Sequence, residues 1–281
     1  MQSAALVVPA VLGSAVLHAS WNALAHGIRD RLVGFSLIGL AYTGVCSVLV
    51  LVTGLPAPAA WPWILASAAV HVLYQLALMG SYRLGQFSQV YPLARGTSPW
   101  VVAVVSLALL GQQLPVVELV GVLVVSAGLI SLVFLGGRPR RADVPALAAA
   151  FATGVMIATY TVLDGVGVHT TSVLSYAAWM FLLQGPAIPL LALVRRGHRL
   201  AADLRPPLLV GLAGGLVSLL AYGLVLWAQT RGALAPIAAL RETSIIIAAL
   251  FGAVFLHERF DRGRAVAGAV VVLGIVLLNL R

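Results

Sequence analysis

The sequence has little charge and no lysine. Only 9% of its 281 residues are charged, whereas a soluble domain carries about 25%. All 17 basic residues are arginine, and the one cysteine, Cys46, lies inside an apolar run. That leaves neither a disulfide framework nor a thiolate metal site. Because 17 basic and 8 acidic side chains cannot cover the outside of a water-soluble fold this large, soluble enzymes are excluded.

Apolar residues are abundant instead. They make up 61% of the chain, and the mean hydropathy is +1.05. They fall into ten runs, each close to the roughly 20 residues that a spanning helix needs. The runs cover residues 5–26, 32–53, 61–81, 88–110, 116–135, 144–162, 171–194, 207–228, 234–256 and 263–280. The sequence therefore predicts an all-α integral membrane protein with ten transmembrane helices and the lipid bilayer as its partner.

The net charge of +9 has no basic stripe or domain to carry it, so a nucleic-acid partner is not expected. Thirteen arginines lie in the odd-numbered loops, and only Arg231 and Arg281 lie on the other side. The positive-inside rule then places the odd loops in the cytoplasm and both termini outside.

The chain also repeats itself. Residues 90–99 align with residues 236–245 at an offset of 146, which places Arg95-Gly96-Thr97-Ser98 on Arg241-Glu242-Thr243-Ser244. Apolar composition alone does not produce this register. We expect two five-helix halves, residues 1–137 and 138–281. An odd number of spans in each half makes them inverted repeats, as in many secondary transporters.

Three features resemble the EamA-type carriers of the drug/metabolite transporter superfamily. They are the paired five-span repeats, the Arg-x-Thr-Ser-Pro opening of the fourth span, and the short acidic loop Leu256-His257-Glu258-Arg259 before a Gly-spaced last span. The resemblance implies a carrier whose termini are cytoplasmic, which differs from the arginine count. It also implies that arginines at positions 95 and 241 often have a structural role.

Polar residues recur on one face of several spans, which is typical of helices that line a central cavity. The predicted substrate-binding residues are Trp21, Asn22, Tyr74, Gln75, Tyr91, Arg95, Tyr160, Tyr222 and Arg241. The two buried arginines favour an anionic substrate such as a carboxylate or phosphonate. The aromatic residues equally favour a cation or an amphipathic drug-like compound.

Four groups are candidates for proton coupling: His18, His71, Asp164 and Glu242. Glu242 either couples protons or pairs with an arginine of another span. Asp164 stands near a span end, where solvation alone would explain it. The histidines either titrate or form hydrogen bonds between helices. No metal-binding motif occurs, and no cofactor is expected.

These observations favour a secondary carrier that moves a small organic metabolite by alternating access, with export as the expected direction. The chain has no phosphate-binding loop for ATP hydrolysis. The alternative is an intramembrane enzyme acting on a lipid-linked or small substrate, although catalytic motifs are missing. We expect a monomer in the plasma membrane of a bacterium.

Overall fold

A computed structural model describes residues 6–84, 87–134, 140–255 and 262–280 of the chain. These residues form helices and contain no strand. The first five predicted runs correspond to α2 (Val7–His26), α3 (Arg31–Thr53), η1 (Pro58–Ala60) with α4 (Trp61–Leu84), α5 (Phe87–Ala108), and α6 (Val116–Ser131) with η2 (Leu132–Phe134).

The second half continues in the same way. Its helices are η3 (Arg141–Asp143), α7 (Val144–Gly167), α8 (Val173–Gln184), α9 (Ala187–Arg196), α10 (Arg199–Leu204), α11 (Leu208–Gln229), α12 (Leu234–Arg241), α13 (Thr243–Phe255) and α14 (Arg262–Asn279). The expected boundary at residues 137 and 138 and the acidic loop around Glu258 lie outside the described residues.

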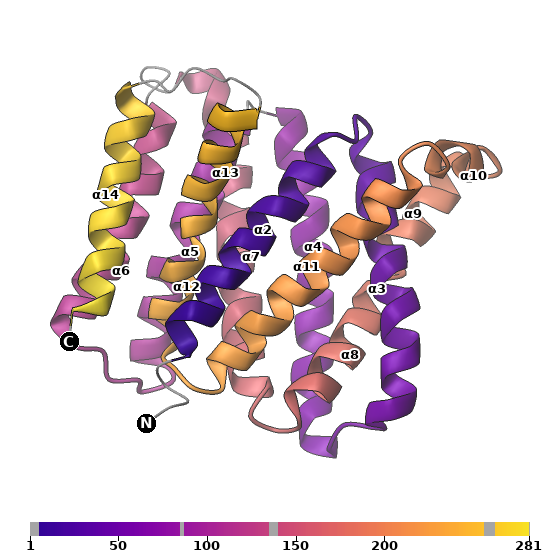
Figure 1. Cartoon of the computed structure of the whole chain (residues 1–281), viewed down its shortest axis with the longest axis horizontal. Helices are drawn as coiled ribbons and strands as arrows, with labels where there is room; N and C mark the ends of the chain where they lie inside the picture. The colour runs from indigo at the N-terminus through magenta and orange to yellow at the C-terminus, as the bar shows by residue number, and fades with distance from the viewer. Residues whose placement is uncertain (1–5, 85–86, 135–139, 256–261, 281) are drawn as a thin grey trace.

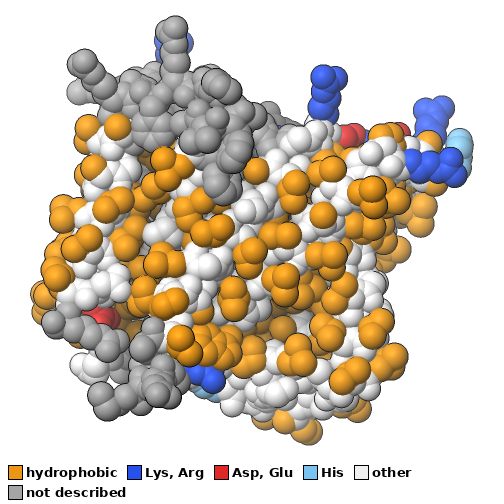
Figure 2. All heavy atoms as spheres, viewed as in Figure 1, with side chains coloured by type: hydrophobic (Ala, Val, Ile, Leu, Met, Phe, Trp, Pro, Cys, Tyr) orange, Lys and Arg blue, Asp and Glu red, His pale blue; other side chains and the backbone are white. Residues whose placement is uncertain are grey.

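Seven segments of the described chain are long and apolar enough to cross a membrane. They run roughly side by side, and Figure 1 shows the start of α2 and the end of α14 at the same end of the molecule. On the face drawn in Figure 2, hydrophobic side chains form a broad band, and charged side chains gather toward its two ends. Exposed leucines and valines such as Leu51, Val194 and Leu209 belong to this apolar surface. A surface of this kind fits a lipid environment and confirms a multi-pass membrane protein.

The arginine-rich end is held together by an ion-pair network. Asp30 begins α3 as its N-cap, accepting a hydrogen bond from the Val33 backbone N–H at 3.2 Å. Arg196, at the end of α9, pairs with Asp30 and also with Asp203 of α10 at 2.7 Å. This end of the molecule is the one at which Figure 1 shows α10.

Glycines allow a close helix crossing between α6 and α14. A Cβ added at Gly274 would lie 2.7 Å from Val125 Cγ2 and 2.9 Å from the carbonyl oxygen of Gly121. Gly128 likewise faces Val271 of α14. Glycines in membrane helices generally indicate close packing, but Gly268 of α14 departs from this rule, since no described atom lies within 4 Å of an added Cβ there.

Two predicted spans are interrupted. The seventh breaks at Gly185-Pro186 between α8 and α9, where a proline cannot donate the next helical hydrogen bond. The ninth breaks at Glu242 between α12 and α13. By contrast, Pro92 and Pro99 lie within a continuous α5. Both breaks lie beside the cavity described next.

Candidate functional site

A cavity of about 60 Å³ lies among α2, α3, α4, α7, α8, α11 and α12. Residues from both halves of the chain form its wall. They are Ser14, His18, Trp21, Phe35, Ile38, Tyr42, His71, Tyr74, Gln75, Tyr160, Phe181, Gln184, Ser218, Ala221, Tyr222, Val225 and Arg241. This volume holds a few water molecules, since one water needs roughly 10–15 Å³.

The structure brings most of the predicted site residues to this wall. Those are His18, Trp21, His71, Tyr74, Gln75, Tyr160, Tyr222 and Arg241. The remaining predicted residues are not part of it. Asn22, Tyr91, Arg95, Asp164 and Glu242 lie behind or beside the cavity on α2, α5, α7 and the α12–α13 break.

Aromatic rings form one side of the cavity. The ring of Tyr160 stacks on His71 with centroids 3.9 Å apart and meets Tyr74 edge-on at 5.5 Å. Tyr222 lies 5.9 Å from Tyr160 and 5.9 Å from Phe181. Contacts of this kind between rings fix their orientation. The rings therefore offer a rigid surface with polar edges to whatever enters.

The two broken spans each bring a polar side chain to the cavity. Gln184 ends α8 directly before the Gly185-Pro186 break, and Arg241 ends α12 directly before the break at Glu242. Gln184 accepts a 3.4 Å hydrogen bond from Gln75 of α4. Broken helices at membrane depth are typical of transporter binding sites, because freed backbone groups can face the cavity.

Arg241 is the cation of the cavity wall. Its side chain is buried, and its Cζ lies 5.3 Å from the centre of the Tyr222 ring. Among the described residues, no carboxylate lies within 4 Å of its guanidinium. A buried cation without a counter-ion is unfavourable, so this position attracts an anion.

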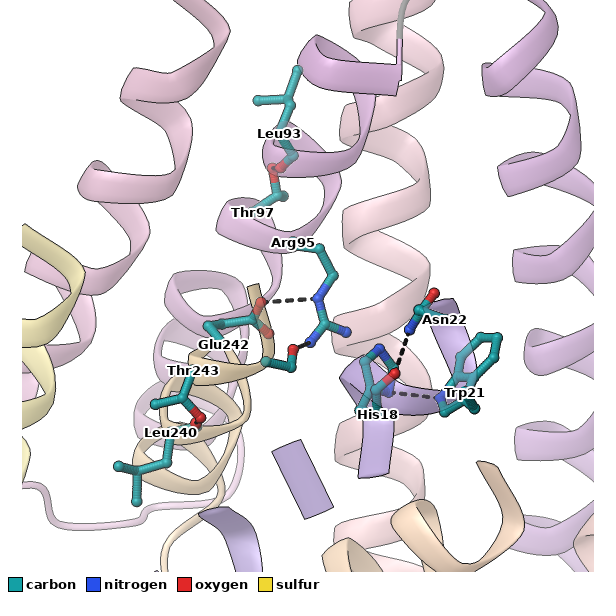
Figure 3. Close-up of polar contacts among 10 residues, drawn as sticks. His18, Trp21, Asn22, Leu93, Arg95, Thr97, Leu240, Glu242 and Thr243 are labelled. Carbon is teal, nitrogen blue, oxygen red and sulfur yellow. Dashed lines mark hydrogen bonds and ion pairs between the residues drawn. The ribbon is translucent and has the colours of Figure 1, made fainter. Parts of the chain in front are cut away.

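Arg95, which the sequence alignment places on Arg241, is arranged differently. Its Nε donates to Glu242 Oε2 at 2.9 Å, and a terminal nitrogen lies 3.4 Å from Ser244 Oγ. Both side chains of the ion pair are about 96–97% buried, with 4% and 3% exposed. The pair joins α5 of the first half to the α12–α13 break of the second (Figure 3). The sequence left two roles open for Glu242, proton coupling or an ion pair with an arginine of another span, and the structure contains that ion pair.

Figure 3 also shows how α2 presents its polar residues. Trp21 Nε1 donates to His18 Nδ1 at 3.2 Å, while Asn22 Nδ2 donates to the His18 backbone carbonyl at 2.8 Å. Indole N–H is only a donor, so His18 Nδ1 carries no proton in this arrangement. Asn22 is thereby turned to its own helix, which keeps it off the cavity wall.

His71 makes its hydrogen bonds within α4. Its Nδ1 lies 3.0 Å from the Ser67 carbonyl oxygen and 3.1 Å from Ser67 Oγ. Because a carbonyl only accepts, this geometry assigns the proton to Nδ1 and leaves Nε2 as the free acceptor. His18 and His71 thus have opposite tautomers in the same cavity wall.

The expectation that Asp164 is solvated at a span end is wrong. Helix α7 continues to Gly167, and Asp164 is 0% exposed. The hydroxyl of Tyr176 donates to its Oδ1 at 2.9 Å, and that of Tyr222 donates to its Oδ2. These tyrosines come from α8 and α11, so they cover the carboxylate through tertiary contacts that local sequence does not reveal.

Several wall residues were absent from the sequence prediction. Tyr42 of α3 bonds Ser218 of α11 at 2.7 Å, and Ser14 of α2 donates to the Ala221 carbonyl at 2.8 Å. Gln184 and Phe181 come from α8. A search for single polar residues in otherwise apolar spans would have found Tyr42 and Gln184. Within the described part of the chain, no group of three or more metal-ligating side chains is placed to hold an ion.

The comparisons with known proteins agree with this architecture. Residues 144–280 match the model of the EamA-like transporter family. A solved structure, described only as the crystal structure of a protein, has a TM-score of 0.76 to this chain. The match covers 100% of this chain and 99% of the chain in that structure, at 18% sequence identity, which indicates a common fold alone. No curated protein matches the sequence.

Members of the matched family are membrane transporters. Its model covers α7 to α14, the segment that contributes Gln184, Tyr222 and Arg241 to the cavity. The resemblance suggested by the sequence motifs is therefore confirmed for this part of the chain: residues 144–280 are similar to EamA-like transporters, which belong to the drug/metabolite transporter superfamily.

Proposed function

We propose that the chain is a ten-pass secondary carrier that binds a small organic anion in this cavity and moves it by alternating access. Its two inverted repeats would be residues 1–137 and 138–281. In a bacterium such a helical protein belongs to the plasma membrane, since the outer membrane is spanned by barrels.

The pairing of helices supports the inverted repeat. Helix α4 packs on α7, which pairs the third span with the sixth. In the same way α11 packs on α2, which pairs the eighth span with the first. Helix α5 packs on α7 as α12 and α13 pack on α2. The α3–α8 and α6–α14 pairs each join spans that correspond between the halves. A two-fold axis in the membrane plane would produce this pattern.

The observation that carries the substrate class is Arg241. It is a buried cation on the cavity wall with no carboxylate partner in the described residues, whereas Arg95 is neutralised by Glu242. Carboxylates and phosphonates match the planar donor fork of a guanidinium. Gln75 and Gln184 add amide donors to the same wall.

The size of the cavity supports a small substrate. Pockets for drug-sized molecules are about 300–1,000 Å³, far more than the 60 Å³ found here. A metabolite of a few heavy atoms suits this conformation better than an amphipathic drug-like compound.

A thermal-shift experiment on purified protein tests this proposal. Small carboxylates and phosphonates are expected to raise the unfolding temperature, because a ligand that binds only the folded state stabilises it. Arg241→Gln should remain folded and bind about tenfold to a hundredfold more weakly, as expected for a lost charge-assisted hydrogen bond. Arg231→Gln is the matched control, since Arg231 lies over Trp227 away from the cavity. Stabilisation by organic cations and by no anion would contradict the assignment.

Counterflow in proteoliposomes separates the transporter from an enzyme. Unlabelled anion loaded inside should drive transient accumulation of labelled anion, and the label should be recovered unchanged. Conversion of the labelled compound into a product by purified protein would favour the enzymatic alternative.

A further inference from the structure

Among the described residues, the buried arginine, aspartate and glutamate side chains form one ion pair and two single charged groups. Arg95 and Glu242 neutralise each other at 2.9 Å. Arg241 and Asp164 are also buried, and neither has an oppositely charged group within 4 Å among the described residues. One unpaired positive and one unpaired negative charge therefore remain in the interior.

Tyr222 joins these two unpaired groups. Its hydroxyl donates to Asp164 Oδ2, and its ring lies 5.3 Å from the Cζ of Arg241. The same ring lines the cavity. One tyrosine thus separates the carboxylate from the place where an anion would bind.

Asp164 is surrounded by groups that tolerate its protonation. Facing it are His71 on α4, Tyr176 on α8, Tyr222 on α11 and Tyr160 on its own helix. Arg241 on α12 lies beyond Tyr222, and Arg95 on α5 is held by Glu242. A phenol hydroxyl both donates and accepts, so Tyr222 can reverse its hydrogen bond when Oδ2 gains a proton.

We propose that Asp164 takes up one proton from water when an organic anion binds at Arg241, so that anion and proton cross the membrane together. This inference rests on the proposed function. The proton forms an O–H bond on the carboxylate, and no other bond is made or broken.

The charge balance explains why the two would move together. With the cavity empty, the positive charge of Arg241 and the negative charge of Asp164 cancel. A monovalent anion alone leaves one net negative charge, and a proton alone leaves one net positive charge. With both bound the net charge is again zero. Because uncompensated charge at membrane depth is costly, the empty and doubly loaded states are the ones that reorient readily. Direction then follows the combined gradients, and an inward proton gradient drives uptake in place of the expected export.

Electrostatics also sets the size of the coupling. Two unit negative charges about 10 Å apart at an effective dielectric constant of about 20 repel enough to weaken binding roughly tenfold. Linkage makes this reciprocal, so a proton on Asp164 strengthens anion binding by the same factor.

The test uses full-length protein and the monocarboxylates acetate, lactate and pyruvate, which keep one negative charge above pH 6. In the wild type, anion affinity should fall as the pH is raised from 6 to 8.5, by no more than about tenfold. Asp164→Asn mimics the protonated group, so its affinity should stay high and constant over this range. Asp30→Asn, a carboxylate outside the spans, should keep the wild-type dependence.

A second measurement needs no variant. Calorimetric titration of the wild type in two buffers of different protonation enthalpy should show net proton uptake on anion binding, which for a tenfold coupling reaches about half a proton per anion at most. Zero protons, or an unchanged pH dependence in Asp164→Asn, would overturn the inference while leaving anion binding intact. If no anion binds at any pH, the proposed function fails and the inference fails with it.

Discussion

At the scale of single residues, two arginines that the internal sequence alignment pairs with each other have different surroundings. Arg95 and Arg241 are 146 residues apart, but only the second is followed by a glutamate. Adjacent helical positions normally point about 100° apart, and the break between α12 and α13 falls at Glu242. Glu242 therefore reaches across to Arg95 and leaves Arg241 to the cavity.

The Arg95–Glu242 pair predicts a strong stability effect. Arg95→Gln would leave a buried carboxylate without its cation, which typically costs about 3–5 kcal/mol. Thermal unfolding in detergent should show a large fall in the unfolding temperature. The double variant Arg95→Gln with Glu242→Gln should recover part of it, because both charges are then removed. Equal stability of the single variant and the wild type would show that the pair is not formed.

The residues of the cavity also show which parts of the site could be predicted from the sequence. Spacing and the repeat identified most of the cavity wall, including His18, Tyr160 and Arg241, because polar residues on apolar spans are few. The sequence did not show that Arg241 lines the cavity and Arg95 does not, because this difference depends on a helix break that local sequence did not predict. Asp164 was misplaced because Tyr176 and Tyr222, which bury it, come from other helices.

At the scale of helices, the α6–α14 crossing predicts a contrast between two glycines of α14. Gly274→Ala would press a Cβ against Val125, and overpacking of this kind costs about 1–3 kcal/mol. Gly268→Ala meets no described atom within 4 Å and gains up to about 1 kcal/mol of helix propensity. The first variant should therefore unfold at a lower temperature than the wild type, and the second should not. Equal behaviour of the two would contradict the crossing.

The link between α3, α9 and α10 predicts a dependence on pH. Burial alone raises the pKa of Asp30, but hydrogen bonds from Arg196 and the Val33 backbone outweigh it and hold the pKa below its ordinary value. A carboxyl whose folded pKa is depressed stabilises the fold above its unfolded pKa, near pH 4, and loses this contribution as pH falls through the folded pKa.

The effect should be small, because the Asp30 side chain is 40% exposed and solvent screens the pair. Asp30→Asn keeps a good helix N-cap and removes only the charge. At pH 7 and low salt it should lower the free energy of unfolding by less than about 1 kcal/mol. At pH 3, or in 1 M salt, the difference from the wild type should shrink. A difference that grows with acid would show that the sign is wrong.

At the scale of the whole molecule, the arginines predict which end faces the cytoplasm. The described loop arginines at 29, 31, 140, 141, 195, 196, 199 and 205 belong to odd-numbered loops, and Arg231 lies in an even-numbered one. The positive-inside rule places the arginine-rich end inside and the termini outside, whereas the family resemblance implies cytoplasmic termini. Cysteine labelling in intact cells distinguishes the two, in a Cys46→Ala background because Cys46 is buried.

Ala201→Cys on α10 and Ala57→Cys between α3 and α4 are exposed positions at opposite ends of Figure 1. From the arginine count, Ala57→Cys should react with a membrane-impermeant maleimide in intact cells. Ala201→Cys should react only after the cells are permeabilised, which also controls for its reactivity. The opposite pattern would place both termini in the cytoplasm. Either result fixes which end of the molecule faces the cytoplasm, because the two labelled positions lie at opposite ends.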